Sequence, residues 1–362
     1  MTVLLAATVP AQASSATRHP SGYRQVNLVS DVGGAAAITD PDLVNAWGLA
    51  ASAGTNQAPG SPLWVSDNGT DKSTLYTGAS PTTVAKAALV VHVTSGAPTG
   101  QVFNTDPTGF VVRDSGGHSG PAVFVFASEN GAIDAWNPGV GATGKPPSTV
   151  TETPVSNWAN AVYKGLAIGK ASSGRTYLYA ANFRSGRVEV YDGTFTPVEL
   201  PGGLFVDRRM PAGYAPFNVQ ELGGRLYVAY AKQDDRLKDD VSGRGHGFVD
   251  VFTNDGAFVR RLVTRGALNS PWGLALAPAG FGRFGGALLV GNFGNGRINA
   301  YNPTTGRHLG ELRKSTGRPI VIRGLWALQF GNGNAAKTGE LLFSAGPGHE
   351  SHGLLGKIVA GS

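Results

Sequence analysis

The chain has 362 residues, of which 53 are glycine and 22 are proline, and only 15% are charged. This balance suits short strands and tight turns, and it argues against helical bundles and long charged tails. The chain has no cysteine, which excludes a disulfide framework. The formal charge of +6 is scattered, without the aromatic-interleaved basic stripe of a nucleic-acid-binding surface, so we expect no nucleic-acid partner.

The first 21 residues are mostly small and apolar or polar without charge. Ala11-Gln12-Ala13 fits the small-x-small cleavage pattern of a signal peptide, although the usual basic segment is missing because Arg18 is the first charge. We expect residues 1–21 to be a signal-peptide remnant and disordered leader, and the protein to be secreted. No apolar run long enough to span a bilayer follows, so no membrane insertion is expected.

The rest of the chain consists of similar segments, each with two apolar strands, a polar strand end, a glycine turn and an outer amphipathic strand. Their innermost strands are anchored by one residue each: Trp47, Phe110, Lys164, Phe217, Trp272 and Trp326. Repeats of four short strands at roughly 55-residue spacing are typical of β-propeller blades. The sequence therefore predicts an all-β protein in which residues 22–362 form one six-bladed β-propeller domain.

The two ends of the repeat array are complementary. Residues 23–29 precede the first innermost strand with nothing of their own to pair with, and the last repeat ends after a strand at 353–359. Pairing the two ends would remove the open sheet edges that invite aggregation. We expect Gln25–Val29 to pair with Leu354–Val359, so that an N-terminal strand closes the ring in the last blade.

Polar residues end several of the second strands, which emerge around the central channel. Four of them would give two carboxylates and two amide oxygens near one axis: Asp67, Glu129, Asn182 and Asn292. Oxygen ligands of mixed charge suit Ca²⁺ or Mg²⁺ better than zinc. The alternative is that each side chain satisfies its own turn.

Two loops after second strands differ from those of the other repeats. Residues 232–240 contain four aspartates and three bases, so Lys232 and Asp234 are candidate ligand-binding residues; a solvated loop with internal ion pairs is the alternative. The second loop, 346–353, contains His349, Glu350 and His352. Either histidine could serve as a general base oriented by Glu350, or the histidines simply hydrogen-bond within a turn.

Both loops should rise from one face, and we expect the largest polar pocket there, lined by several blades. The candidate ligand-binding residues are Trp47, Lys164, Lys232, Asp234, Trp272, Asn292 and Trp326. Rings exposed at the funnel could stack on a sugar, whereas buried rings would fill the gaps between blades.

Whole phrases of the chain resemble a family of exported bacterial propellers of uncharacterised function with NHL-like repeats. These phrases include NAWGLA, VSDNGT, PTGQVFN, YKGLA, LYVAYAKQDD, LNSPWGLALAPAGFG and SAGPGHESHG. The resemblance implies a six-bladed fold and export. A looser one, to gluconolactonase- and paraoxonase-type propellers, implies Ca²⁺ in the channel with Asn182 and Asn292 as amide ligands; Asn45-Ala46-Trp47 stands where those enzymes have a Glu.

These features favour a secreted, monomeric propeller that binds a small molecule or glycan at a polar central funnel. One alternative is a metal-assisted hydrolase, lactonase or lyase with a histidine base. The other is a protein-interaction scaffold that uses its outer blade edges, for which a funnel plugged by aromatics would be typical.

Overall fold

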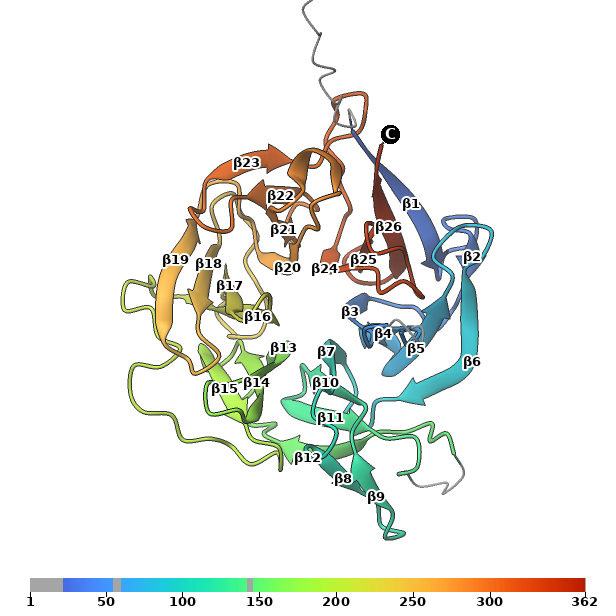
Figure 1. The fold of residues 1–362 in the computed structure, drawn as a ribbon, viewed down its shortest axis with the longest axis vertical. Helices are drawn as coiled ribbons and strands as arrows, with labels where there is room; N and C mark the ends of the chain where they lie inside the picture. Colours follow the sequence, from blue (N-terminus) through green and yellow to red (C-terminus); the bar gives the residue numbers. More distant parts are fainter. Residues whose placement is uncertain (1–21, 55–59, 142–145, 362) are drawn as a thin grey trace, which may run out of the picture.

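The computed structural model describes residues 22–54, 60–141 and 146–361, and within them the chain forms six blade sheets arranged around a central axis, with one separate two-stranded hairpin (Figure 1). The predicted all-β, six-bladed propeller is confirmed. No helix among these residues is long and apolar enough to cross a membrane.

The first three blades follow one another from the innermost strand outwards. Blade one comprises β3 (Ala46–Ala50), β4 (Leu63–Asp67), β5 (Lys72–Thr77) and β6 (Ala85–His92), with the 3₁₀ turn η1 (Asn68–Thr70) after β4. Blade two comprises β7 (Pro98–Phe103), β10 (Phe124–Ser128), β11 (Ala132–Trp136) and β12 (Glu152–Ser156), with the hairpin β8 (Val111–Arg113) and β9 (Ser119–Pro121) inserted after β7. Blade three comprises β13 (Tyr163–Lys170), β14 (Thr176–Asn182) and β15 (Arg187–Tyr191).

The remaining three blades complete the ring. Blade four comprises β16 (Tyr214–Glu221), β17 (Leu226–Lys232), β18 (Phe248–Phe252) and β19 (Phe258–Thr264). Blade five comprises β20 (Pro271–Leu276), β21 (Leu288–Asn292), β22 (Ile298–Tyr301) and β23 (His308–Glu311), with the 3₁₀ turn η2 (Gly282–Phe284) after β20. Blade six comprises β24 (Leu325–Phe330), β25 (Leu341–Ala345), β26 (Leu354–Ala360), β1 (Tyr23–Ser30) and the short β2 (Ile38–Thr39).

The second strand of a blade is buried on both faces, which explains its apolar sequence. LWVSD in β4, FVFAS in β10, LLVGN in β21 and LLFSA in β25 are buried at every position. Neighbouring blades cover both faces of these strands, so no alternation of polar and apolar residues is needed. The polar residues that end them are thereby carried to one end of the ring.

The N-terminal strand closes the ring as the sequence predicted. Strand β1 runs antiparallel to β26, with Gln25 opposite Ile358 and Val29 opposite Leu355 (Figure 1). The hydroxyl of Ser30 also donates a hydrogen bond to the carbonyl of Gly353. Both ends of the described chain therefore belong to one sheet, and β26 has no open edge.

The structure corrects the predicted blade two. Its innermost strand is Pro98–Phe103, and Phe110 lies just before the inserted hairpin, packed against Phe195. The strand lacks an apolar run because its backbone packs directly against the backbone of the next blade's innermost strand. A Cβ on Gly100 would lie only 2.6 Å from the amide nitrogen of Leu166. Blade three also departs from expectation, since the segment after β15 pairs through an isolated bridge rather than a fourth strand.

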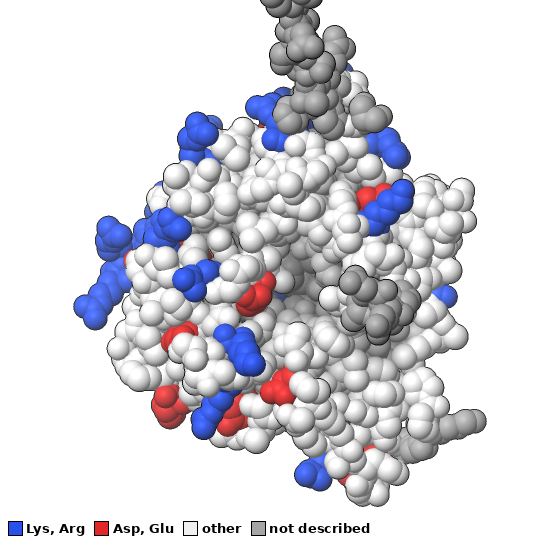
Figure 2. All heavy atoms as spheres, viewed as in Figure 1, with Lys and Arg blue, Asp and Glu red and all other residues white. Residues whose placement is uncertain are grey.

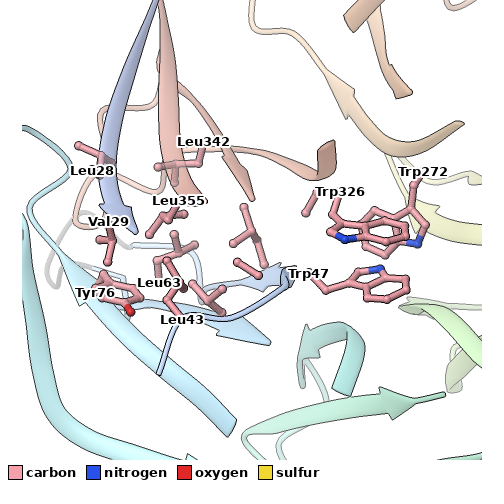
Figure 3. Close-up of a cluster of buried hydrophobic side chains, with 14 of the residues drawn as sticks. Leu28, Val29, Leu43, Trp47, Leu63, Tyr76, Trp272, Trp326, Leu342 and Leu355 are labelled. Atoms are coloured by element: carbon pink, nitrogen blue, oxygen red, sulfur yellow. The ribbon is translucent and has the colours of Figure 1, made fainter. Parts of the chain in front are cut away.

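Three tryptophans close the centre of the ring (Figure 3). The indoles of Trp47 and Trp326 stack at 3.6 Å between centroids, and Trp272 packs edge-on against both. Trp47 and Trp326 are 1% exposed and Trp272 is 4% exposed. Such pairs add roughly 0.5–1.5 kcal/mol each beyond the area that they bury. These three rings form a packed layer, so none of them offers an exposed face for stacking on a sugar.

Candidate functional site at the mouth of the ring

Polar side chains from five blades meet beside the tryptophan layer. They come from the segments that lead into innermost strands or follow second strands. We call this set the mouth network: Asn45, Asn68, Glu129, Lys164, Asp239 and Glu350. Only blade five contributes no member.

Lys164, near the start of β13, is the cation of the mouth network. Its Nζ lies 2.5 Å from Oε1 of Glu129 and 3.2 Å from Oδ1 of Asp239, while its side chain is only 2% exposed. The ammonium also lies 5.2 Å from the centre of the Trp47 ring. Burial disfavours the charged amine, but the charges of Glu129 and Asp239 hold the pKa of Lys164 above its usual value. Lys164 is therefore a charged, positioned ammonium.

Two asparagines connect the carboxylates to the tryptophan layer. Nδ2 of Asn68 donates to Oε2 of Glu129 at 3.0 Å, and Nδ2 of Asn45 donates to Oδ1 of Asn68 at 3.1 Å. The same Asn45 amide donates to Oε2 of Glu350 at 2.8 Å, and its own oxygen accepts from Nε1 of Trp326 at 2.9 Å. The packed rings thus fix the orientation of the polar groups above them.

Glu350 reaches the mouth network from a strained turn. Both His349 and Glu350 have positive φ, 57° and 67°, a conformation that costs non-glycine residues of order 1–3 kcal/mol each. Burial and then the nearby charge of Glu129 raise the pKa of Glu350, against the opposing effects of Lys164 and the Asn45 hydrogen bond. Glu350 is therefore the least neutralised carboxyl group of the set.

The general-base hypothesis requires Glu350 to contact His349 or His352, and the structure does not bring these side chains together. His349 is exposed, and Nδ1 of His352 pairs with Asp31 at 2.8 Å on an exposed edge of blade six. Among the described residues, Glu350 hydrogen-bonds to Asn45 and to neither histidine. The turn delivers a carboxylate to the mouth and leaves both imidazoles outside it.

The predicted metal ligands lie mostly in their own blades. Asp67 is fully buried and accepts a hydrogen bond from Thr74, while Asn182 donates to Glu189 and Asn292 donates to the carbonyl of Ala267. Only Glu129 faces the mouth network. Within the described ranges, no three His, Asp or Glu side chains are placed to hold a metal ion. Calcium binding remains a prediction from the sequence, and metal analysis of the purified protein tests it.

The other predicted ligand-binding residues have local roles. The Asp234 carboxylate accepts hydrogen bonds from the backbone amides of Lys238 and Asp239 and so shapes the loop that presents Asp239. Lys232 is exposed at the end of β17. Of the predicted set, Lys164 pairs with Glu129 and Asp239, and Trp326 donates a hydrogen bond to Asn45.

The expectation that the largest polar pocket lies at the mouth is wrong. No member of the mouth network lines any of the cavities identified in the described residues, and the cavity between the innermost strands, further along the channel, has a volume of only about 20 Å³. A cavity of about 960 Å³ instead lies between blades four and five. The tryptophan layer accounts for the difference, because it fills the space in which a deep funnel would lie.

Three members of the mouth network were missed as site residues in the sequence. In the sequence, Asn45 stood out only for replacing a Glu and Asp239 only as one of four loop aspartates, and Asn68 was not singled out. A signal was available for Asn45, which stands two positions before a tryptophan anchor and takes φ of 47°. Asparagine tolerates this left-handed conformation better than most residues.

Comparison with known proteins identifies relatives over nearly the whole chain. No family model matches. The uncharacterized protein R648 of Acanthamoeba polyphaga mimivirus is 32% identical over 337 residues, covering 91% of this chain and 78% of its own. Protein L690 of the same virus is 34% identical over 339 residues, covering 92% and 84%. The chain belongs to the family of these two viral proteins.

This membership revises the resemblance drawn from the sequence. The relatives reported above are viral rather than bacterial, and nothing found supports an NHL assignment. Both are described as uncharacterized, so they assign no activity to the family. The shared length indicates that the whole ring, and not a single blade, is the unit they have in common.

Solved structures share the general architecture at low identity. The PQQ-bound aldose sugar dehydrogenase of Streptomyces coelicolor matches with a TM-score of 0.48 and 13% identity, covering 94% of this chain and 99% of its own. A structural-genomics protein provisionally assigned as a gluconolactonase matches with a TM-score of 0.37 and 14% identity, covering 65% and 84%. Likenesses of this size carry no functional argument.

Proposed function

We propose that this protein is a secreted, monomeric binding protein that holds a small polyhydroxylated ligand, such as a sugar, at the mouth network. The observation that carries the proposal is the convergence of polar side chains from five blades on one ion-paired cluster. The strained turn that delivers Glu350 supports it, because strain of this kind is concentrated at functional sites. The small, apolar start of the chain and its small-x-small pattern at Ala11-Gln12-Ala13 support export.

The charges of the mouth network favour a neutral ligand rich in hydroxyl groups. Three carboxylates surround one ammonium, so the site repels anions. The Asp239 side chain is 60% exposed and Glu350 is half-buried, so the oxygen of each carboxylate that is not paired with Lys164 or Asn45 can accept hydrogen bonds from hydroxyl groups. Hydrogen bonds to ionised acceptors are roughly twice as strong as neutral ones.

The geometry favours binding over hydrolysis by the predicted His–Glu pair. A general base must lie within hydrogen-bond reach of the proton that it removes, and the histidines of the turn lie outside the network. The scaffold alternative gains the aromatic plug expected for it, because the tryptophan layer closes the centre of the ring, but the described residues do not present the apolar surface that a protein partner would bury. The large apolar side chains exposed in the described part of the chain belong to separate elements, such as Trp158 in blade two and Val321 before blade six, and single exposures are normal.

A thermal-shift screen with neutral mono- and disaccharides tests the proposal. Sugars also stabilise proteins without binding, because they are excluded from the surface. The decisive quantity is therefore the difference between the wild-type shift and that of Glu350→Gln or Asp239→Asn. Asp235→Asn is the matched control, since it removes the same charge from an exposed position of the same loop.

We expect at least one sugar to raise the melting temperature of the wild type and of the control by several degrees more than that of the two mouth variants. A ligand at 100 times its Kd stabilises the folded state by about 2.7 kcal/mol. Equal shifts in all four proteins across the whole panel would contradict the proposal.

A further inference from the structure

A wide groove separates the outer strands of blades four and five, and none of its lining residues belongs to the mouth network. It has a volume of about 960 Å³ and lies between the end of β19 and its following loop on one side and β22 and β23 on the other. Figure 1 shows β19 and β23 side by side at the outer rim. We call it the arginine groove, because five arginines line it: Arg244, Arg265, Arg283, Arg297 and Arg313.

One carboxylate faces these arginines. Glu311 accepts a hydrogen bond from Arg297 at 3.0 Å and another from Arg313. Its side chain is only 12% exposed, so the acid is covered by the two guanidinium groups. Two positive charges are thus held in place by one negative charge.

The other three arginines have no carboxylate partner within the described residues. Arg265 lies over the rings of Tyr214 and Phe248, and Arg283 lies over the ring of Phe284. Arg244 is exposed at the edge of the groove. Figure 2 shows Lys and Arg gathered along the rim where β19 and β23 lie. The groove therefore carries a net positive charge that its own residues do not neutralise.

The groove is also lined by two buried donors that lack partners. Nδ2 of Asn299 and the hydroxyl of Tyr301 make no hydrogen bond, although the residues are only 3% and 2% exposed. Burial raises the pKa of Tyr301, so the phenol stays protonated and can donate. Native proteins rarely leave buried donors unpaired. Their position beside the arginines indicates a ligand with several acceptor oxygens.

From these observations we infer that the arginine groove binds an acidic polysaccharide. Guanidinium groups pair with carboxylate or sulfate oxygens in bidentate geometry, and Asn299 and Tyr301 supply donors for ring or hydroxyl oxygens. The volume reaches the upper end of the range for drug-sized ligands, about 300–1,000 Å³, so it exceeds what a single inorganic anion fills. Nucleic acid is a poorer fit, because the two aromatic rings lining the groove give no row of open faces for base stacking: Tyr301 is buried, and His308 packs against it.

Binding to immobilised polygalacturonate and heparin at 150 mM salt tests this inference. The groove variant Arg265→Gln/Arg297→Gln is compared with Arg175→Gln/Arg225→Gln, which removes the same charge from exposed turns of blades three and four. We expect the groove variant to bind at least one of the two polysaccharides at least tenfold more weakly, since one lost charge-assisted hydrogen bond corresponds to about a factor of ten. The control pair should change the affinity less than about twofold, because distant exposed charges are screened.

A second variant guards against a merely diffuse electrostatic effect. Tyr301→Phe keeps the ring and every charge and removes only an unpaired hydroxyl, so it should fold with unchanged or greater stability and still bind more weakly. Four results would each overturn the inference. Two concern the variants: an equal loss of affinity in the control pair, or unchanged affinity in Tyr301→Phe. Two concern the ligand: equal binding to uncharged dextran, or competition by duplex DNA as strong as that by polysaccharide. Glu350→Gln should bind polysaccharide as the wild type does, which separates this site from the mouth network.

Discussion

Replacing Lys164 by methionine removes the single cation of the mouth network and keeps most of the volume of the side chain. The ammonium is 2% exposed and its partner Glu129 is 12% exposed, so the variant leaves a nearly buried carboxylate without its counter-charge. Breaking a buried pair in this way costs about 3–5 kcal/mol. Asp239 adds little to this figure, because its side chain is 60% exposed and solvent screens it.

The expected change in melting temperature follows from the size of the domain. Unfolding entropy is about 2.1 cal/mol/K per residue, which gives roughly 0.7 kcal/mol/K for a ring of about 340 residues. A loss of 3–5 kcal/mol then corresponds to a fall of about 4–7 °C at pH 7.5.

The pH dependence identifies the cause. In the wild type, burial of Glu129 is outweighed by the charge of Lys164, which lowers the pKa of the carboxyl group. A carboxyl group whose pKa is lowered by folding stabilises the folded state at pH values above its unfolded pKa of about 4.3. This stabilisation is lost as the pH falls through the pKa of the folded state. Without Lys164, burial alone should raise the pKa of Glu129, so the variant gains stability as pH falls. The gap between the two proteins should therefore narrow from pH 7.5 to pH 4.5.

Differential scanning fluorimetry at both pH values checks this reasoning, with Lys170→Met as the control from an exposed position of the same strand. Glu129→Gln added to Lys164→Met should recover part of the lost stability at pH 7.5 and abolish the narrowing. If Lys164→Met melts with the wild type at pH 7.5, or if the gap is the same at both pH values, Lys164 is not the counter-charge of Glu129.

Substitutions and a deletion test three further features: the tryptophan layer, the ring closure and a buried carboxyl group. Replacing Trp326, which is 1% exposed, by alanine should cost about 3–5 kcal/mol, whereas alanine at the 66% exposed Trp158 should change little; urea denaturation compares the two. Removing residues 1–30 takes away β1 and opens the edge of β26, so we expect aggregation on size-exclusion chromatography, while removing 1–21 alone should leave a monomer. Burial and a neighbouring carboxylate raise the pKa of Asp250 to about 7, so its proton is held more tightly in the folded state and stability falls as pH rises from about 4 to 7. Asp250→Asn should remove this fall and melt higher than the wild type at pH 8; melting curves at pH 5 and pH 8 provide the measurement.

The architecture could be predicted because the repeat records local packing demands. Second strands buried on both faces must be apolar throughout, and a lone amphipathic strand at the N-terminus must find a partner, so the ring closure of β1 with β26 followed from the sequence. Blade two escaped prediction for the opposite reason. Its innermost strand is placed by Gly100 lying against the backbone near Leu166, and such an approach leaves a small, polar sequence. The apolar Phe110 marked a buried residue, but not a strand.

The sequence predicted where the candidate site lies in the fold, but not all of the residues that form it. Strand-end positions identified Glu129, and the anchor position identified Lys164, because the repeat fixes where those residues emerge. The asparagines and Asp239 were not singled out, because their roles depend on side-chain contacts between blades. Asn182 shows the converse: its amide serves Glu189 in its own blade, and nothing in the spacing distinguishes such a turn residue from a ligand.

The two proposed sites carry opposite charges, and this determines what each can bind. The mouth network holds three carboxylates around one ammonium, whereas the arginine groove holds five guanidinium groups around one carboxylate. An acidic polysaccharide attracted to the groove is repelled by the mouth, and a neutral sugar gains little from unpaired arginines. The sites should therefore bind independently. Any coupling between them would pass through blade four, whose loop after β17 supplies Asp239 to the mouth network and Arg244 to the groove.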